Sequence, residues 1–186
     1  MDGGANPAFR TASTFPGSVS VSGFTVMSAE EDGIRLVARD DMAIDHMTAS
    51  GVGDGMDEDD TGDDGIDARS TQGNIVVTDS TANDNGDPFG LYTDGFDLKA
   101  PNGDVTVRRV TANGNMGIDD SDGVDVWETG GNVTIMDSTA NGNSFNGFVL
   151  TTQADVSISG TVTDENGNDG IEVYETDGAV SIEGSS

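Results

Sequence analysis

Residues 133–150, VTIMDSTANGNSFNGFVL, contain the unit from which most of the chain is built. The unit opens with an alternating apolar segment, Val133-Thr134-Ile135, and closes with a glycine followed by a second such segment, Phe148-Val149-Leu150. Residues 156–173, VSISGTVTDENGNDGIEV, repeat this layout, and in both stretches the glycine lies 12 residues after the last apolar residue of the first segment. A period of two residues indicates β-strands, and no helical period is present.

Both segments recur along the chain at intervals of 23 to 33 residues. The first segment recurs at residues 19–21, 42–44, 75–77, 105–107, 133–135, 156–158 and 180–182. The glycine segment recurs at residues 33–36, 65–68, 95–98, 123–126, 147–150 and 170–173. One repeat is too small to bury its own apolar side chains, so successive repeats must stack. The longer repeats insert residues almost only before the glycine, as expected for stacked coils with one variable loop.

Small polar residues hold fixed positions in the turn between the two segments. The first position is occupied by Ser50, Asn83, Asn113, Asn141 and Asp164, and the second, two residues later, by Asn85, Asn115, Asn143 and Asn166. Asparagine tolerates left-handed turn conformations, and amides at equivalent positions of stacked turns can hydrogen-bond to one another. The sequence therefore predicts ladders of asparagine side chains along the stack.

Two short strands per repeat, joined by glycine and asparagine turns, resemble the right-handed parallel β-helix of the pectin-lyase-like superfamily, with its PbH1-type repeats. The resemblance covers residues 17–186 and implies an all-β, single-stranded solenoid of six to seven coils. Residues 1–16 are expected to form an N-terminal cap or extension. The superfamily includes lyases, hydrolases, esterases and non-catalytic surface proteins, so the fold alone does not fix an activity.

The chain is strongly acidic. Its 186 residues include 35 Asp and Glu against 7 Lys and Arg, which gives a net charge of −28, and there is no cysteine. This balance excludes a phosphate-binding surface, so we expect no nucleic-acid partner. No apolar run is long enough for a membrane span. The excess of Asp resembles proteins of halophilic microbes, in which concentrated salt screens the repulsion. Although no signal peptide opens the chain, we expect an extracellular or cell-surface location.

Asp67, Asp97 and Asp125 hold the same outward position in three successive glycine segments. Adjacent strands lie about 4.8 Å apart, so these carboxylates repel one another unless counter-ions or protons intervene. A salt-screened, solvated surface and a row of bound Ca²⁺ ions are both compatible with the column. The acidic insertion at residues 51–64 offers a second place for Ca²⁺ through Asp57 and Asp59, although it lacks the closing glutamate of an EF-hand loop.

The next outward position on these strands reads Arg69, Lys99, Trp127, Thr151 and Tyr174. Aromatic rings beside charged hydrogen-bonding groups are typical of sugar-binding surfaces. We therefore predict a glycan platform, which consists of Arg69, Lys99, Trp127 and Tyr174. In the alternative interpretation, the two cations neutralise the aspartate column and the two rings fill grooves.

One segment resembles an enzyme motif. Residues 92–97, YTDGFD, are similar to the Asn-Thr-Asp-Gly segment of polygalacturonase-type hydrolases, and Asp119-Asp120 to their Asp-Asp pair, which implies acid–base catalysis by carboxylates. The resemblance ends there. Residues 145–147, FNG, stand where those hydrolases have Gly-His-Gly, and no Arg or Lys follows Arg109. Asp94-Gly95 also fits the ordinary repeat, so we predict no catalytic residue set and expect the single histidine, His46, to be a structural or surface residue.

Three functions follow from these patterns. The leading hypothesis is a non-catalytic extracellular or cell-surface scaffold that self-associates, end to end or laterally, and/or binds glycans in high salt. The first alternative is a polysaccharide-acting enzyme of the uronate lyase or hydrolase type, or a fragment of one. The second is a Ca²⁺-dependent binding module, with Ca²⁺ as the only cofactor. The expected partners are further copies of the chain and a polysaccharide.

Overall fold

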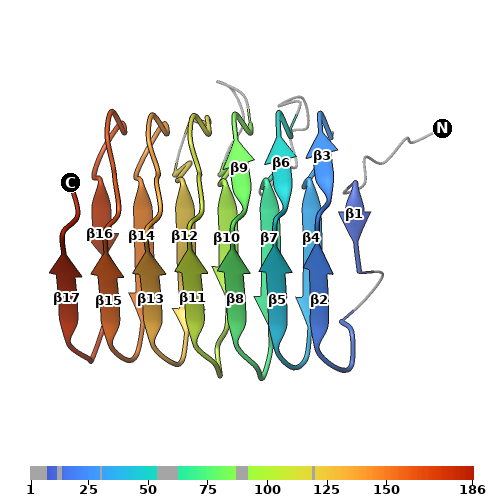
Figure 1. The fold of residues 1–186 in the computed structure, drawn as a ribbon, viewed down its shortest axis with the longest axis horizontal. Coiled ribbons are helices and arrows are strands. Elements are labelled where there is room, and N and C mark those ends of the chain that lie inside the picture. Colours follow the sequence, from blue (N-terminus) through green and yellow to red (C-terminus); the bar gives the residue numbers. More distant parts are fainter. Residues whose placement is uncertain (1–7, 12–13, 30, 54–62, 87–91, 119) are drawn as a thin grey trace.

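The computed structural model describes residues 8–11, 14–29, 31–53, 63–86, 92–118 and 120–186. Within these ranges the strands run parallel to one another in three sheets that follow the long axis of a coiled stack (Figure 1). The stacked parallel coils predicted from the repeats are thus confirmed. None of the described residues belongs to a helix of the kind that crosses a membrane.

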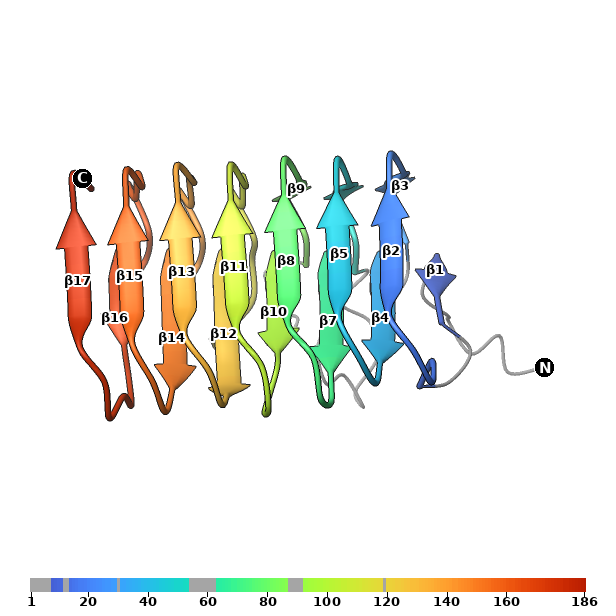
Figure 2. The same cartoon turned by 60° about the horizontal axis from the view of Figure 1, so that its bottom comes forward.

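Two sheets of seven strands and one of three form the walls of the coil. Sheet A contains β1 (Phe9–Arg10), β4 (Ile34–Ala38), β7 (Ile66–Ser70), β10 (Phe96–Lys99), β12 (Val124–Thr129), β14 (Phe148–Thr152) and β16 (Ile171–Val173). Sheet B contains β2 (Val19–Ser22), β5 (Met42–Asp45), β8 (Ile75–Thr78), β11 (Val105–Arg108), β13 (Val133–Met136), β15 (Val156–Ser159) and β17 (Val180–Glu183). Sheet C contains β3 (Thr25–Met27), β6 (Thr48–Ser50) and β9 (Thr81–Asn83). Figure 2 shows sheet A behind sheet B, coil after coil.

The register places equivalent residues of successive repeats side by side. In sheet B, Val105 pairs with Ile75 on one side and with Val133 on the other. In sheet A, the glycine segments pair in the same manner, except for a bulge between β12 and β14. There Val126 pairs with Leu150 but Thr129 pairs with Thr152, so β12 carries one extra residue. Bulges of this kind redirect side chains and are common beside binding sites.

Alternate side chains of each strand fill the interior. The largest fully buried ones include Phe96, Phe148, Ile34 and Leu36. The glycine before each sheet A segment is required by close packing between coils. At Gly123 an added Cβ would meet the carbonyl oxygen of Gly147 at 2.6 Å, a distance at which the coils could not stack. This contact explains the invariable glycine of the repeat.

The predicted asparagine ladders are confirmed. Inside the coil, the Asn85 amide donates to Asn115 Oδ1 at 2.9 Å, Asn115 to Asn143 at 2.9 Å and Asn143 to Asn166 at 3.0 Å. In the outer ladder, the backbone N–H groups of successive turns donate to the Oδ1 atoms of Asn83, Asn113 and Asn141. The buried amides are therefore hydrogen-bonded, which removes the cost of burying polar groups.

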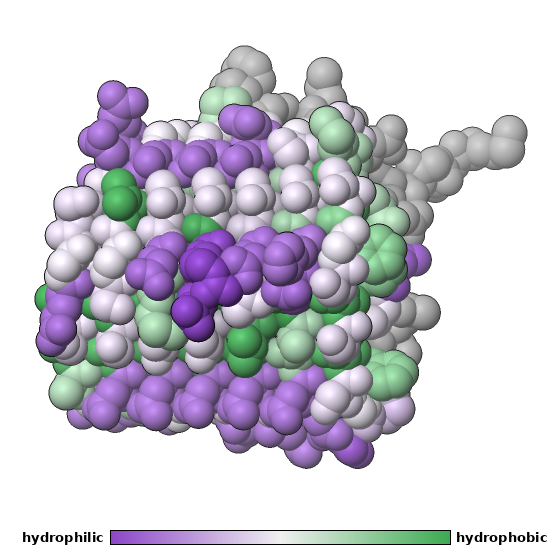
Figure 3. Space-filling model, in the orientation of Figure 1, coloured by the Kyte–Doolittle hydropathy of each residue, from purple (hydrophilic) through white to green (hydrophobic). Residues whose placement is uncertain are grey.

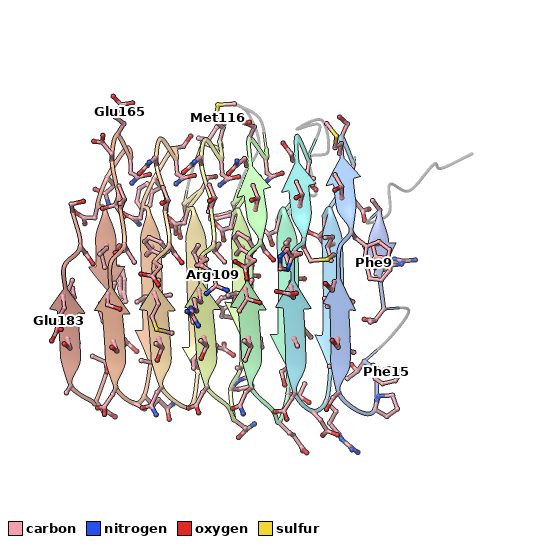
Figure 4. The ribbon with its side chains drawn as sticks, in the orientation of Figure 1. Phe9, Phe15, Arg109, Met116, Glu165 and Glu183 are labelled. Carbon is pink, nitrogen blue, oxygen red and sulfur yellow. The ribbon has the colours of Figure 1, made fainter. Side chains whose placement is uncertain are left out.

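The two ends of the stack differ. Near the N-terminus, Phe9 pairs with Ile34 of sheet A and stacks on Phe24 with ring centroids 5.1 Å apart (Figure 4). Phe15 forms a β-bridge with Ala38. These contacts place part of the first 16 residues against the first coil, while the boundary at residue 17 stays a prediction. At the other end, the outermost strand of sheet B leaves Ile182 half-exposed.

Candidate functional site

A cleft of about 630 Å³ crosses the outer face of sheet A over β12, β14 and β16. Its lining comes from the strands and from the turns that lead into β10, β12, β14 and β16. It consists of Tyr92, Asp120, Asp125, Trp127, Phe145, Val149, Thr151, Asn168, Glu172 and Tyr174. A smaller pocket of about 230 Å³ adjoins the cleft toward β7 and shares Tyr92, Asp120, Asp125 and Trp127 with it.

Trp127 lies at the junction of the two hollows. Its indole N–H donates a hydrogen bond to Asp97 Oδ1. The Lys99 ammonium lies 3.7 Å from the ring centroid and forms an ion pair with Glu128, and the Arg69 guanidinium carbon lies 5.9 Å from the same centroid. Three side chains from β7 and β10 thus fix the ring, which limits the side-chain entropy that is lost when a ligand stacks against it.

The predicted glycan platform is brought together only in part. Arg69, Lys99 and Trp127 are direct neighbours in the register of sheet A, but the bulge after Trp127 ends the strict column. Trp127 and Tyr174 line the cleft, and Arg69 lines the smaller pocket. Lys99 lines neither. The turn residues Tyr92, Phe145 and Asn168 complete the cleft and were not predicted as site residues.

The aspartate column has the predicted register but not the expected exposure. Asp97 pairs directly with Asp67 and Asp125. The interpretation as a solvated surface is wrong for Asp67 and Asp97, which are only 1% and 6% exposed, whereas Asp125 is partly buried. Arg69 Nε lies 2.8 Å from Asp67 Oδ1, and its Nη2 lies 3.2 Å from Asp97 Oδ2. Arg35 adds a second guanidinium at 3.2 Å from Asp67. The chain itself therefore supplies counter-ions for two of the three carboxylates.

The contacts of the described residues bear on some of the possible metal sites and not on others. Among the described residues, one group of three has ligand atoms within 4.8 Å of one another: Asp45, His46 and Asp79, beside sheet B. Arg109 Nη2 lies 2.5 Å from Asp79 Oδ2, so a guanidinium already neutralises one carboxylate of this group. Figure 4 labels Arg109. Ca²⁺ binding by Asp67, Asp97 and Asp125 stays a prediction. Asp57 and Asp59 lie outside the described residues.

A second acidic column lies beside the first, at the residues that precede the glycines. Asp32, Asp64, Asp94 and Asp122 are all buried. Each accepts a hydrogen bond from the backbone N–H of its counterpart in the next coil, at 3.1, 2.9, 2.7 and 2.7 Å in that order. In the sequence, this column is visible as an acidic residue or Asn before each glycine. The repeat pattern did not indicate that these residues are buried.

Burial raises the pKa values of the carboxyl groups in both acidic columns, and repulsion between neighbouring carboxylates adds to the effect for most of them. Burial, with Asp67 as a second cause, raises the pKa of Asp32 to about 7 and that of Asp97 to about 6. Burial raises the pKa of Asp122 to about 7, and neighbouring Asp120 adds to the effect. For Asp125, burial and then Asp97 raise the pKa well above the usual range. Its Oδ1 is enclosed and has no hydrogen-bond partner among the described residues.

Residues 11–186 match the family model described as a right handed beta helix region. The chain belongs to this family. A search of curated proteins finds no match, and a search of solved structures finds none either. The predicted fold class, an all-β right-handed parallel β-helix, is therefore confirmed, together with the general likeness to pectin-lyase-like folds.

Membership in the right-handed β-helix family does not assign an activity, so the enzyme resemblance depends on the site. Asp94, Asp97 and Asp120 all line the smaller pocket. Asp119 lies outside the described residues. Phe145 stands in the cleft at the place of the missing Gly-His-Gly motif, and His46 follows β5 of sheet B. The carboxylates of the motif are thus gathered in this β-helix, without a histidine beside them among the described residues.

Proposed function

We propose that this β-helix is a non-catalytic glycan-binding scaffold of the extracellular space or cell surface, and that the sheet A cleft holds the sugar. The observation that carries the proposal is the lining of the cleft. Tyr92, Trp127, Phe145 and Tyr174 offer four aromatic rings, and carboxylate, amide and hydroxyl groups lie between them. Rings stack on the apolar faces of sugars, while carboxylates and amides accept hydrogen bonds from their hydroxyl groups.

The dimensions of the cleft agree with this function. A volume of about 630 Å³ lies in the range of small-ligand sites, which is about 300–1,000 Å³. The cleft extends over three coils, and the coils repeat along one axis, so an extended oligosaccharide can lie across successive strands. The ion pairs and the hydrogen bond around Trp127 hold its ring in place before a ligand arrives.

Isothermal titration calorimetry with a panel of oligosaccharides tests the proposal, in salt at which circular dichroism shows the fold intact. Tyr174→Ala removes a ring of the cleft whose side chain is 69% exposed, so the change leaves the core untouched. Met27→Ala is the matched control, because Met27 is 71% exposed and does not line the cleft. Binding that Tyr174→Ala weakens and Met27→Ala does not supports the proposal. A native chain that binds no glycan of the panel contradicts it.

Self-association belongs to the same proposal. Among the strands that the structure describes, the outer strand β17 pairs with β15 alone, and Val180 and Ile182 are 46% and 50% exposed. An unpaired strand edge with apolar side chains favours pairing with another chain. Light scattering is expected to find oligomers of the native chain and to find them weakened in Ile182→Lys. A native chain that remains monomeric at all concentrations tested contradicts self-association.

A polysaccharide-acting enzyme is the second candidate, because Asp94 and Asp97 share the smaller pocket and both have raised pKa values. Paired carboxyl groups of this kind can serve as acid and base. Hydrolysis or elimination on uronate polymers, abolished in Asp94→Asn, would favour the enzyme over the scaffold. Asparagine at this position keeps the Oδ1 acceptor of the ladder, as Asn146 does two coils later. No turnover across the panel removes this candidate.

A further inference from the structure

The sheet A cleft is anionic as well as aromatic. Among its ten lining residues are three carboxylates, Asp120, Asp125 and Glu172, and none is Lys, Arg or His. The cations nearby already have partners. Arg69 pairs with Asp67 and Asp97, and Lys99 pairs with Glu128. The charge of the cleft is therefore not cancelled by its own surroundings.

Asp125 is the carboxyl group at the centre of this acidic lining. It lines both the cleft and the smaller pocket, so it lies where the two hollows meet. Its Oδ1 is enclosed but accepts no hydrogen bond from any described residue. Burial and then Asp97 raise the pKa of Asp125, and a positive charge bound beside this carboxyl group would lower that pKa and favour the ionised form. Its neighbour in the next coil, Val149, carries no charge with which it could pair.

Carboxylates and aromatic rings together form a site for an organic cation. The faces of Trp and Tyr rings attract a positive charge, and a carboxylate forms a strong, charge-assisted hydrogen bond with an ammonium group. A uronate would be repelled by the same groups, and a neutral sugar would bring no positive charge to these carboxyl groups. The cleft therefore selects among glycans by their charge.

We propose that the ligand of the sheet A cleft is a glycan with protonated amino groups, of the glucosamine type. The inference rests on the proposed function and names its ligand class. Asp125 and Glu172 receive the ammonium group, and Trp127 and Tyr174 stack on the sugar ring. Thr151 and Asn168 offer a hydroxyl and an amide oxygen for the remaining hydroxyl groups.

Two oligosaccharides that differ only in charge test this proposal. Glucosamine tetramer and N-acetylglucosamine tetramer share the same sugar backbone, but acetylation removes the positive charge. By calorimetry at neutral pH, we expect the glucosamine tetramer to bind about tenfold more tightly, the effect of one partly desolvated charge pair. Added salt should reduce this difference, since it screens charge interactions.

Isosteric variants locate the effect. Asp125→Asn and Glu172→Gln are each expected to weaken binding of the glucosamine tetramer about tenfold and to leave the acetylated tetramer unchanged. Asp104→Asn is the matched control. It removes the same charge from an exposed position at the edge of sheet B, where the neighbouring coils already carry Asn74 and Asn132. Circular dichroism confirms that each variant is folded.

The outcomes separate this inference from the proposed function. Equal binding of both tetramers overturns the amino-sugar assignment and leaves a glycan-binding cleft. Failure of both tetramers and of every other glycan overturns the proposed function as well. Spermidine is the third ligand for calorimetry, because it carries amino groups but has no sugar ring. If spermidine binds as tightly as the glucosamine tetramer, the assignment of a sugar is wrong.

Discussion

The indole N–H of Trp127 donates a hydrogen bond to the carboxylate of Asp97, its diagonal neighbour on the adjacent strand of sheet A. This bond joins the two columns predicted from the repeats, the aspartate column and the column that contains the glycan platform. Asp97 also accepts from Arg69, so a single buried carboxylate holds both a cation and a ring in position. The geometry of the cleft therefore depends on a group that does not line it.

Replacing Trp127 by Phe is expected to weaken both the fold and the cleft. Phe retains a ring but removes the donor, so Asp97 loses one hydrogen bond and its pKa rises further above about 6. The free energy of unfolding should fall by about 1 kcal/mol, measured by urea denaturation. Tyr174→Phe is the control, because Tyr174 is 69% exposed and the change removes only its hydroxyl group. Equal stability of Trp127→Phe and the native chain would contradict a structural role of the bond.

Acidification should stabilise this protein. The pKa values of about 7, 6 and 7 for Asp32, Asp97 and Asp122 exceed the ordinary value of about 4, so the folded state binds these protons more tightly than the unfolded state. The free energy of unfolding should therefore fall as pH rises from about 4 through about 7. Urea denaturation at constant high salt measures this. A stability that rises over the same range would show that these carboxyl groups are ionised in the fold.

Asp122→Asn should isolate one part of this dependence. Asparagine keeps the Oδ1 acceptor for the next coil and carries no charge, and Asn146 already fills the same position one coil later. At about pH 8 the variant should be more stable than the native chain by about 1–4 kcal/mol, because it removes a buried carboxylate whose pKa is about 7 in the fold and about 4 in the unfolded chain. At about pH 4 the difference should nearly disappear, because the native carboxyl group is then neutral. Asp104→Asn, at an exposed position, should show neither effect.

The inner asparagine ladder should matter more than the outer one. Asn115 is fully buried, and its Oδ1 accepts from both the backbone and the side chain of Asn85. Asn115→Ala leaves those donors without a partner and creates a cavity, so we expect a loss of about 2–4 kcal/mol in urea denaturation. Asn113→Ala, in the outer and more exposed ladder, should cost about 1 kcal/mol. Equal losses in the two variants would show that burial does not distinguish the ladders.

The repeats predicted the register because a constant two-residue period fixes which face each side chain occupies, and stacking then aligns equivalent residues. Asp67, Asp97 and Asp125 are adjacent for this reason. Their burial could not be predicted, because it depends on what covers the outer face of sheet A. Arg35 and Arg69 lie over the column, and the turns that precede the glycines enclose it.

The cleft was only partly predictable. Trp127 and Tyr174 share a position in the repeat, and the repeat pattern therefore predicted both as site residues. Tyr92 and Phe145 lie in the turns before the glycines, where the repeat length varies and register gives no alignment. The bulge at Trp127 and Glu128 adds a residue that no spacing in the sequence revealed.

The most direct test uses the fact that the chain contains a single tryptophan. A nitrogen–proton correlation spectrum therefore shows one indole signal, from the group that bonds to Asp97 at the junction of the cleft and the smaller pocket. On titration with glucosamine tetramer, this signal is predicted to shift and saturate, and to shift less in Tyr174→Ala. Figure 3 shows hydrophilic rows across the opposite, sheet B face, whose signals should remain unchanged. An indole signal that stays fixed with every glycan tested would contradict the proposed cleft.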